Sequence, residues 1–339
     1  PARFAAHFGN KKKAGSPNVF VDSPFILAIL ISGIIAGVLM LALWLGLDRA
    51  VARRLVLGAV IPAVAVAVPA AIGLPETARG GVGAPLLMLV LGGVCGAILD
   101  FSRLSARVCM SVAAVLLVLG AWLVLAAPIT GLSYHPGMIQ IIAWVAFLVV
   151  GGCVLWVTRP DFTEDEDALA KPTKGKKPKT AKAKSAKPAA LEPGDLAKPG
   201  PVAVLMTLAL GQGIVGHMFG LTDHVVFLAA LWSALIVALV SEKAAPQYRA
   251  TVWLGVVGAL MAAAASAMIM NPASCVAYAV LLLVVSGRPA ATRLSAHLPT
   301  DNLPQAALLG SAIRVGVLAL PLIMAALVAY VGAEMAARA

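Results

Sequence analysis

Long apolar stretches, repeated from one end of the chain to the other, constrain the fold of this protein more than any other feature. A helix needs about 20 mostly apolar residues to cross the hydrocarbon core of a bilayer. Within lipid, a segment must satisfy its own backbone hydrogen bonds, and a helix does so. The sequence therefore predicts an all-α polytopic membrane protein with about nine or ten transmembrane helices. The stretches are residues 25–47, 55–74, 84–99, 108–127, 138–157, 202–220, 224–241, 251–270, 273–287 and 306–333.

The composition agrees with a membrane class. Of the 339 residues, 61% are hydrophobic and only 12% are charged, and the mean hydropathy is +0.95. A soluble domain is about 45–50% apolar and about 25% charged. The four cysteines lie far apart, in or at the ends of apolar stretches, so we expect small buried side chains and no disulfide framework. They are Cys95, Cys109, Cys153 and Cys275.

One segment, residues 158–201, differs from everything around it. An acidic run, Glu164–Asp167, is followed by nine lysines between Lys171 and Lys198, interleaved with Ala and Pro. Low hydrophobicity with high charge predicts disorder. The predicted organisation is a polar N-terminal segment, a first membrane half, this linker, a second membrane half and a C-terminal tail. Their ranges are 1–24, 25–157, 158–201, 202–333 and 334–339.

The linker lysines have two interpretations. Basic side chains beside a membrane are attracted to anionic lipid headgroups, and the same lysines could form a docking arm for a cytoplasmic protein partner. The net charge of +11 does not indicate nucleic-acid binding, because most other basic residues lie in short segments between apolar stretches, as the positive-inside rule describes. The lysines that we select for lipid or partner contact are Lys174, Lys176, Lys177, Lys179 and Lys182.

The same rule predicts the orientation: a bacterial inner membrane with the linker in the cytoplasm. The N-terminus conflicts with this, because ten full crossings would place Lys11–Lys13 outside. Alternatively, segment 55–74, which contains Pro62 and Pro69, or the short segment 84–99 is re-entrant, and the N-terminus is cytoplasmic after nine crossings. The first apolar stretch is too long for the core of a secretory signal, so we expect no cleavable signal.

Two sequence patterns concern helix packing. Gly33/Gly37, Gly92/Gly96 and Gly216/Gly220 have the four-residue spacing that allows helices to approach closely. The segments Asp100–Arg107 and Glu242–Arg249 share an acid, a central basic residue and a final arginine. They indicate either a duplication relating 55–157 to 202–287, as in many transporters, or ordinary cytoplasmic caps.

Candidate site residues gather in one glycine-rich stretch, Gly211–Gly220. It contains Gln212 and His217, and Asp223 and His224 follow it. Polar groups at membrane depth are costly and often functional, and His217 could exchange protons with Asp223 or His224. Alternatively, Gln212 bonds across a helix interface and His217 faces the headgroups.

Arg314 lies within the last apolar stretch. It is either a counter-ion for an anionic substrate or a side chain that extends to the headgroups. His135 and several methionines near the outer ends of the stretches have no recognised ligand spacing, so we predict neither a metal nor a cofactor.

No G-x-S-x-G, H-E-x-x-H or phosphate-binding loop is present, so an enzyme is not favoured. Two functions remain. The first is a transporter or permease for a small or lipid-linked solute, suggested by the number of stretches, their two halves and the polar stretch around Gln212. The second is a non-catalytic membrane subunit or scaffold of a larger envelope complex, suggested by the scarcity of deeply placed charges. In either case the partners are the bilayer and, for the second, other proteins.

Overall fold

The computed structural model describes residues 23–75, 81–102, 105–125, 138–160, 198–241, 247–296 and 303–338. Throughout these ranges the regular structure is helical, with no strand. The first half contains α1 (Pro24–Gly46), α2 (Arg49–Leu55), η1 (Val56–Ala59), α3 (Val60–Ile72), α4 (Gly83–Ser102), α5 (Ala106–Leu125) and α6 (Met138–Thr158). The second contains α9 (Pro201–Met218), α10 (Thr222–Ser241), α11 (Ala250–Val252), η3 (Trp253–Val257), α12 (Gly258–Met270), η4 (Pro272–Ser274), α13 (Cys275–Leu281), η5 (Leu282–Ser286), α14 (Gly287–Ser295) and α15 (Leu303–Arg338).

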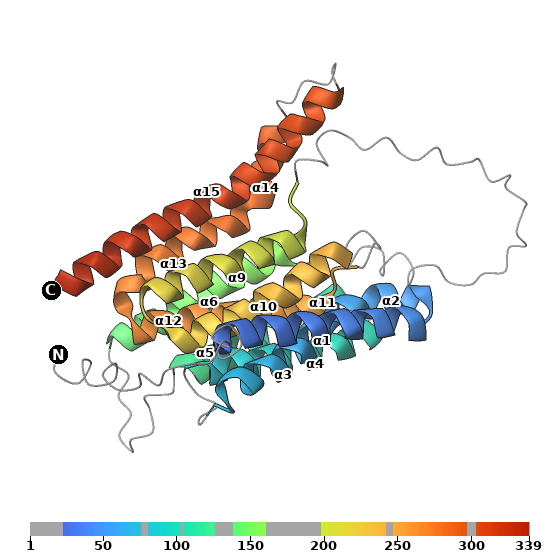
Figure 1. Cartoon of the computed structure of the whole chain (residues 1–339), viewed down its shortest axis with the longest axis horizontal. Coiled ribbons are helices and arrows are strands. Elements are labelled where there is room, and N and C mark those ends of the chain that lie inside the picture. Colours follow the sequence, from blue (N-terminus) through green and yellow to red (C-terminus); the bar gives the residue numbers. More distant parts are fainter. Residues whose placement is uncertain are drawn as a thin grey trace, which may run out of the picture.

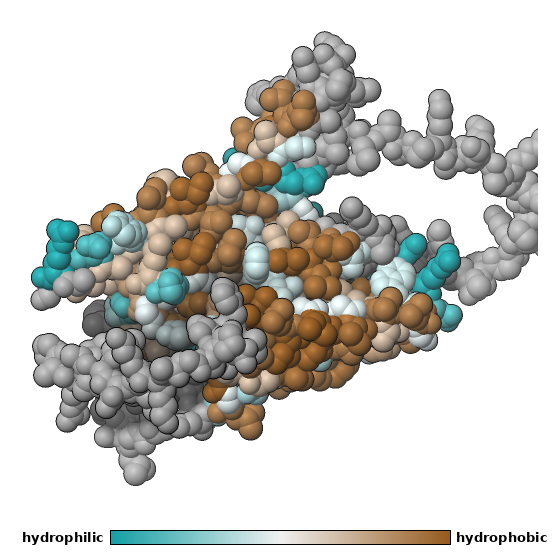
Figure 2. All heavy atoms as spheres, viewed as in Figure 1, coloured by the Kyte–Doolittle hydropathy of each residue, from teal (hydrophilic) through white to brown (hydrophobic). Residues whose placement is uncertain are grey.

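In the described part of the chain, nine helices are long and apolar enough to cross a membrane. Some of them are built from several elements, such as Val51–Ile72 and Ala250–Met270. α6 is a further apolar helix, whose described side chains span 144–158. The predicted all-helical class is confirmed, and these helices are consistent with a multi-pass membrane protein. Figure 2 shows apolar side chains over the middle of the bundle and hydrophilic ones toward its ends.

The helices form one bundle with two distinct ends (Figure 1). We call the first the linker end, because Thr158 and Pro201 lie there and line one small cavity together with Arg288. Backbone and side-chain hydrogen bonds bring Arg53 and Asp100 to the same end.

We call the second end the far end. Val82, Leu221 and Met270 line a common hollow there, and Ser23 lies in a cavity with Thr222.

The spans Val51–Ile72 and Gly83–Ser102 both run from one end of the bundle to the other. Both are long and apolar enough to span a membrane, and Ser23 lies at the end opposite Thr158, which is the arrangement that the ten-crossing alternative predicts. A short 3₁₀ turn, η1, precedes Pro62, and Pro69 lies inside α3 without ending it. Lys11–Lys13 lie outside the described residues.

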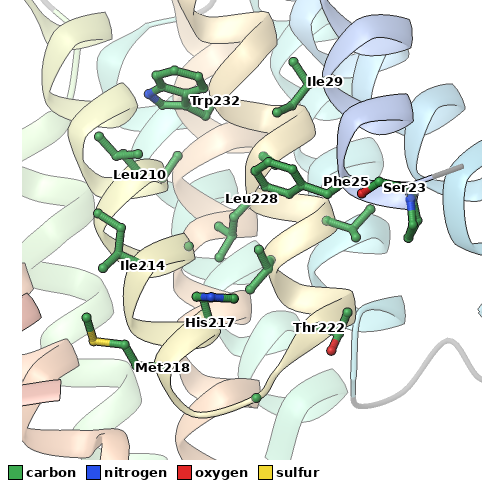
Figure 3. Close-up of a pocket in the computed structure, with 17 residues that line it drawn as sticks. Ser23, Phe25, Ile29, Leu210, Ile214, His217, Met218, Thr222, Leu228 and Trp232 are labelled. Carbon is green, nitrogen blue, oxygen red and sulfur yellow. The ribbon is translucent and has the colours of Figure 1, made fainter. Parts of the chain in front are cut away.

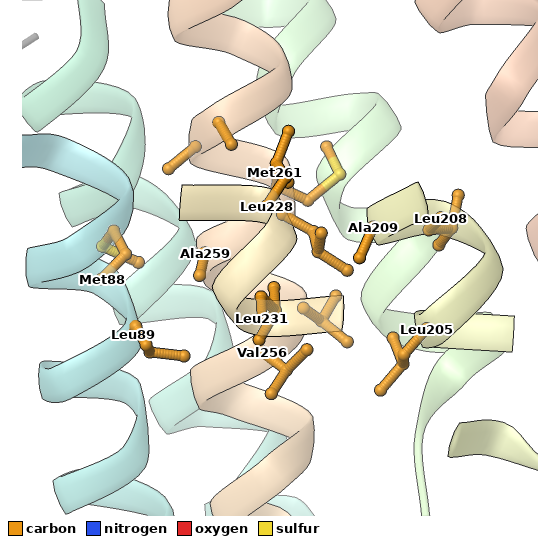
Figure 4. Packing of buried hydrophobic residues seen from close by; sticks show 14 of the residues in the cluster. Met88, Leu89, Leu205, Leu208, Ala209, Leu228, Leu231, Val256, Ala259 and Met261 are labelled. Carbon is orange, nitrogen blue, oxygen red and sulfur yellow. The ribbon is translucent and has the colours of Figure 1, made fainter. Parts of the chain in front are cut away.

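The centre of the bundle is formed by α10 and by the continuous span made of α11, η3 and α12. In the most apolar 18-residue stretch of Ala250–Met270, 83% of the residues are buried. In the corresponding stretch of α15, at the periphery, only 11% are buried. Figure 4 shows Leu228 and Leu231 of α10, and Ala259 of α12, between side chains of α4 and α9. The many alanines of α12 allow its neighbours to pack closely around it.

The tightest helix crossing joins α4 to α11 and η3. A Cβ on Gly92 would overlap with the backbone of Leu254 and Gly255, and one on Gly96 would overlap with Ala250 and Thr251. Here the predicted glycine spacing does bring two helices together. The chain forms a π-turn, Trp253–Val257, at this crossing, where a regular helix would present a different set of backbone atoms to α4.

A second crossing joins α1 to α10, which run in the same direction. Gly33 lies against Ser233, and Gly37 faces Val237. The hydroxyl of Ser32 donates to the carbonyl of Ala230, and the hydroxyl of Ser233 donates to that of Ile29, both at 2.8 Å. Such reciprocal bonds join two helices inside an apolar environment at about 0.6 kcal/mol each.

The third glycine pair has another role. A Cβ on Gly216 would meet only ordinary contacts, and Gly220 has φ +72 and begins the turn from α9 to α10. This is the left-handed backbone conformation that glycine adopts without cost at the end of a helix.

The two sequence halves are interleaved in space. Helix α1 of the first half packs on α10 of the second, and α4 packs on α11 and α12. The predicted duplication stays a hypothesis.

Two predicted non-helical regions differ from the structure. The gap between the predicted apolar stretches 273–287 and 306–333 is helical from Gly287 to Ser295, where it continues the span that begins at Pro272. The tail expected over 334–339 is helical to Arg338, which pairs with Glu334 at 3.6 Å.

Candidate functional site

Helix α9, which contains Gln212 and His217, is bordered by cavities on two of its faces. It begins with Pro201 at its first turn, a position suited to proline, and it packs on α10, α15 and α13. Gly211 faces Leu281 and Leu322 so closely that a Cβ there would displace them. Gly213 has no neighbour closer than 3.7 Å to such a Cβ, because it lines a cavity.

The larger cavity is a groove of about 820 Å³ between α1, α9 and α10. Its residues are nearly all apolar, and its polar side chains are Ser23, His217 and Thr222, with the indole of Trp232 at greater depth. Figure 3 shows His217, Met218 and Thr222 toward one end of the groove and Trp232 and Ile29 toward the other. His217 is exposed, so its imidazole faces the groove and the surroundings of the protein.

The second cavity, about 460 Å³, lies between α6, α9, α12 and α13. Gln212 belongs to its lining and is only 3% exposed. The amide nitrogen donates to the carbonyl of Leu260 at 3.2 Å, whereas the amide oxygen is buried without a hydrogen-bond partner among the described residues. A buried acceptor without a partner costs free energy, so Gln212 is poorly explained by packing alone.

Asp223 and His224 line a third hollow, of about 230 Å³, at the far end. Asp223 is exposed, whereas His224 is 1% exposed. The Nε2 atom of His224 has no partner among the described residues. His217 lies in the groove and not in this hollow, so the structure does not join His217, Asp223 and His224 into one proton-exchanging cluster.

Arg314 lies far from these residues. Gly332 of α15 is level with Phe219 at the far end, and 18 residues of helix, about 27 Å, separate it from Arg314. Gly287 contacts Val317 nearby, which places Arg314 in the linker half of the bundle. This position suits a side chain that extends to the headgroups.

A polar cluster at the linker end was not predicted. The carboxylate of Asp100, at the end of α4, accepts hydrogen bonds from the backbone of Ala250 at 3.1 Å and Thr251 at 2.9 Å. It also accepts from the Thr251 hydroxyl at 2.5 Å. Asp100 therefore caps the helical span that begins at Ala250, although the two are 150 residues apart.

The neighbouring side chains stabilise the same corner. Arg249 is 7% exposed and donates to the side-chain oxygen of Gln247 at 3.0 and 2.7 Å. The backbone nitrogen of Gln247 donates to the carbonyl of Arg53 at 2.7 Å. Burial raises the pKa of the Tyr248 phenol, so this group stays neutral. The hydrogen bonds of Asp100, Gln247 and Arg249 hold this corner together, whereas the buried Tyr248 hydroxyl has no partner among the described residues.

The groove could not be found from the sequence. Phe25 and Ile29 do not differ in sequence from other apolar residues, and they line the groove only because α1 packs beside α10. Within the described residues, no group of three or more His, Cys, Asp or Glu could hold a metal ion. The lysines Lys174, Lys176, Lys177, Lys179 and Lys182 lie outside the described residues. In comparisons with known proteins, no protein-family model matches the chain, and no curated protein matches it in sequence.

Proposed function

We propose that the protein is a transporter or permease of a bacterial inner membrane that moves a small or lipid-linked solute along α9. The observation that carries this proposal is the pair of cavities on different faces of α9, one containing His217 and the other Gln212. The centre of the bundle is otherwise closely packed. A carrier needs a cavity beside an element that can move, and α9 has a cavity on two of its faces.

A carrier can change conformation by rotation of its two halves against each other or by movement of a single helix. The contacts favour the second, with α9 as the helix that moves. Rocking would break the backbone contacts of Gly92 and Gly96 and the cap formed by Asp100. In contrast, a Cβ on Gly213 or Gly216 of α9 would make only ordinary van der Waals contacts, at 3.6 Å or more. The cavities on two faces of α9 leave space into which this helix could shift, although such a shift would have to break its contacts with α10 and α15.

The charge distribution supports a cytoplasmic linker end. Among the described basic residues outside the middle of the bundle, only Arg338 is at the far end. At the linker end the basic residues are Arg49, Arg53, Arg54, Arg107, Arg159, Lys198, Arg249, Arg288 and Arg293. The lysines of residues 171–187 would then lie beside anionic headgroups.

Variants of α9 test the proposal. We expect Gln212→Leu and His217→Ala to abolish the phenotype that the wild-type gene restores in a deletion strain, with membrane abundance unchanged. Gln212→Leu should change stability little, because it removes a buried acceptor without a partner together with the hydrogen bond to the carbonyl of Leu260. Thr207→Ala is the control: its hydroxyl bonds within α9 to Ala203 at 2.8 Å and borders neither cavity. Full activity in both test variants would refute the assignment.

A second candidate function, a membrane subunit of a larger complex, is favoured by α15. This helix spans 36 residues at the edge of the bundle, and many of its large apolar residues are exposed. A stable partner that co-purifies in mild detergent, and is lost when Leu327 and Val331 are replaced by serine, would support it. A single monodisperse chain would count against it.

A further inference from the structure

The shape of the groove follows from which helices touch. α10 packs extensively against both α1 and α9, whereas α1 and α9 make few contacts with each other. α10 therefore forms the floor, α1 and α9 form the walls, and Figure 1 shows α10 between them. The groove opens away from the floor, toward the side of the bundle and thus toward the surrounding lipid.

The length of the groove corresponds to one leaflet. Its lining runs along α10 from Thr222 at the far end to Trp232, ten residues or about 15 Å of helix. The hydrocarbon core of a bilayer is about 30 Å thick, so the groove ends near the middle of the membrane. A molecule that entered from the far side would meet the end of the groove at that depth.

Polarity changes along the groove in one direction. The hydroxyl of Thr222 and the imidazole of His217 lie toward the far end. Deeper in, Ile29, Leu228 and Ala229 form an apolar lining, and the indole nitrogen of Trp232 is buried. This order, polar at the membrane surface and apolar below it, is that of an amphiphile in a bilayer. A fully polar solute would have to be desolvated against the deep part of the lining.

We propose that the groove binds one hydrocarbon chain of a membrane lipid from the leaflet at the far end, which enters sideways between α1 and α9. The polar head of the lipid lies beside Thr222 and His217, and the end of the chain lies beside Ile29 and Trp232. This deepens the proposed function, on which it rests, by naming the class of molecule that the site takes. The occupant is a lipid of the bilayer itself and not a water-soluble solute.

A matched pair of glycine variants tests the binding. Gly213→Leu adds a side chain at a position that lines the groove, and Gly316→Leu adds the same side chain on α15, where nothing lies within 4 Å. Both replace a helical glycine and gain the same helix propensity. In native mass spectrometry after purification in mild detergent, we expect the wild type and Gly316→Leu to retain one lipid. Gly213→Leu should retain at least tenfold less.

Photoreactive lipids test the orientation. A lipid with a diazirine at the end of its chain should label peptides that contain Ile29 or Trp232. A lipid with the diazirine next to the headgroup should label the peptide of His217 to Thr222. Gly213→Leu should abolish both labels, whereas Gly316→Leu should preserve them. Equal labelling of all variants, or the reverse order of the two probes, would overturn the proposal.

The lipid inference and the transport proposal fail in different ways. If no variant retains a lipid but Gly213→Leu abolishes the cellular phenotype, the groove transports another solute and the lipid inference is wrong. If Gly213→Leu loses the lipid but keeps the phenotype, the lipid site stands and the transport role of the groove is wrong. Equal retention of lipid by the wild type and Gly213→Leu contradicts the lipid site directly.

Discussion

Asp100 illustrates how a single side chain acquires its role from a distant part of the chain. An acid at the end of an apolar stretch could hold a metal ion, face water or bind the end of another helix. Its carboxylate accepts three hydrogen bonds from Ala250 and Thr251. Gln212 is the opposite case, because one of its polar atoms is bonded and the other is left without a described partner.

At this scale we predict that Asp100→Ala destabilises the fold. The substitution leaves the nitrogens of Ala250 and Thr251 without their acceptor, at a cost of about 1–3 kcal/mol. We expect a lower unfolding temperature of the detergent-solubilised protein, and a smaller decrease for Asp100→Asn, which keeps one acceptor oxygen. Asp223→Ala, at an exposed position, is the control. An unchanged unfolding temperature for Asp100→Ala would show that the cap contributes nothing.

At the scale of helices, small residues decide which elements can touch. Gly92 and Gly96 allow the backbone of α4 to approach Ala250–Gly255, and Gly33 allows α1 to approach Ser233. Gly216 and Gly220 have the same spacing but serve a loosely packed helix end and a turn. The spacing alone therefore indicates where a close crossing is possible, and the neighbouring helix decides whether one forms.

We predict that Gly92→Ala and Gly96→Ala strongly reduce the amount of folded protein. Each added methyl group would overlap with backbone atoms of α11 or η3, which cannot rotate away as a side chain can. Size-exclusion chromatography of fluorescent fusions should show aggregation or loss of the monodisperse peak. Gly316→Ala adds the same methyl group to an open helix face and should behave like the wild type. A normal profile for Gly96→Ala would contradict the close crossing.

At the scale of the whole molecule, the order of the helices between the two ends predicts which segments lie on the same side of a membrane. The described helices place Ser23 at the far end and Thr158 at the linker end. All the basic residues near Arg53, Arg107 and Arg288 share the linker end with Thr158.

Reporter fusions test this arrangement. We expect a fusion near Lys182 to report the cytoplasm, where basic segments are retained, and a fusion near Lys12 to report the opposite side of the membrane. The first expectation rests on charge, and the second rests on an odd number of crossings between the two sites, which are α1, α3, α4, α5 and α6. Reports from the same side would contradict the helix order, and a periplasmic signal at Lys182 would reverse the orientation.

The candidate site was predictable only in part. A polar pair inside a glycine-rich apolar stretch identified α9, and Gln212 and His217 both line cavities. The sequence also placed Asp223, His224 and Arg314 among the candidates, but Asp223 and His224 line a separate hollow. Arg314 lies about 27 Å along α15 from the level of the far end.

Local chemistry explains what the sequence by itself determined. The length and hydropathy of each stretch decide that it is a helix long and apolar enough to cross lipid, because those conditions act on each segment separately. Tertiary structure decided the rest: that α1 lies beside α10, that Asp100 caps a helix 150 residues away, and that a groove remains between α1 and α9. These features depend on which helices meet. In lipid, small residues and a few hydrogen bonds choose the partner of each helix, since apolar side chains pack equally well against lipid chains.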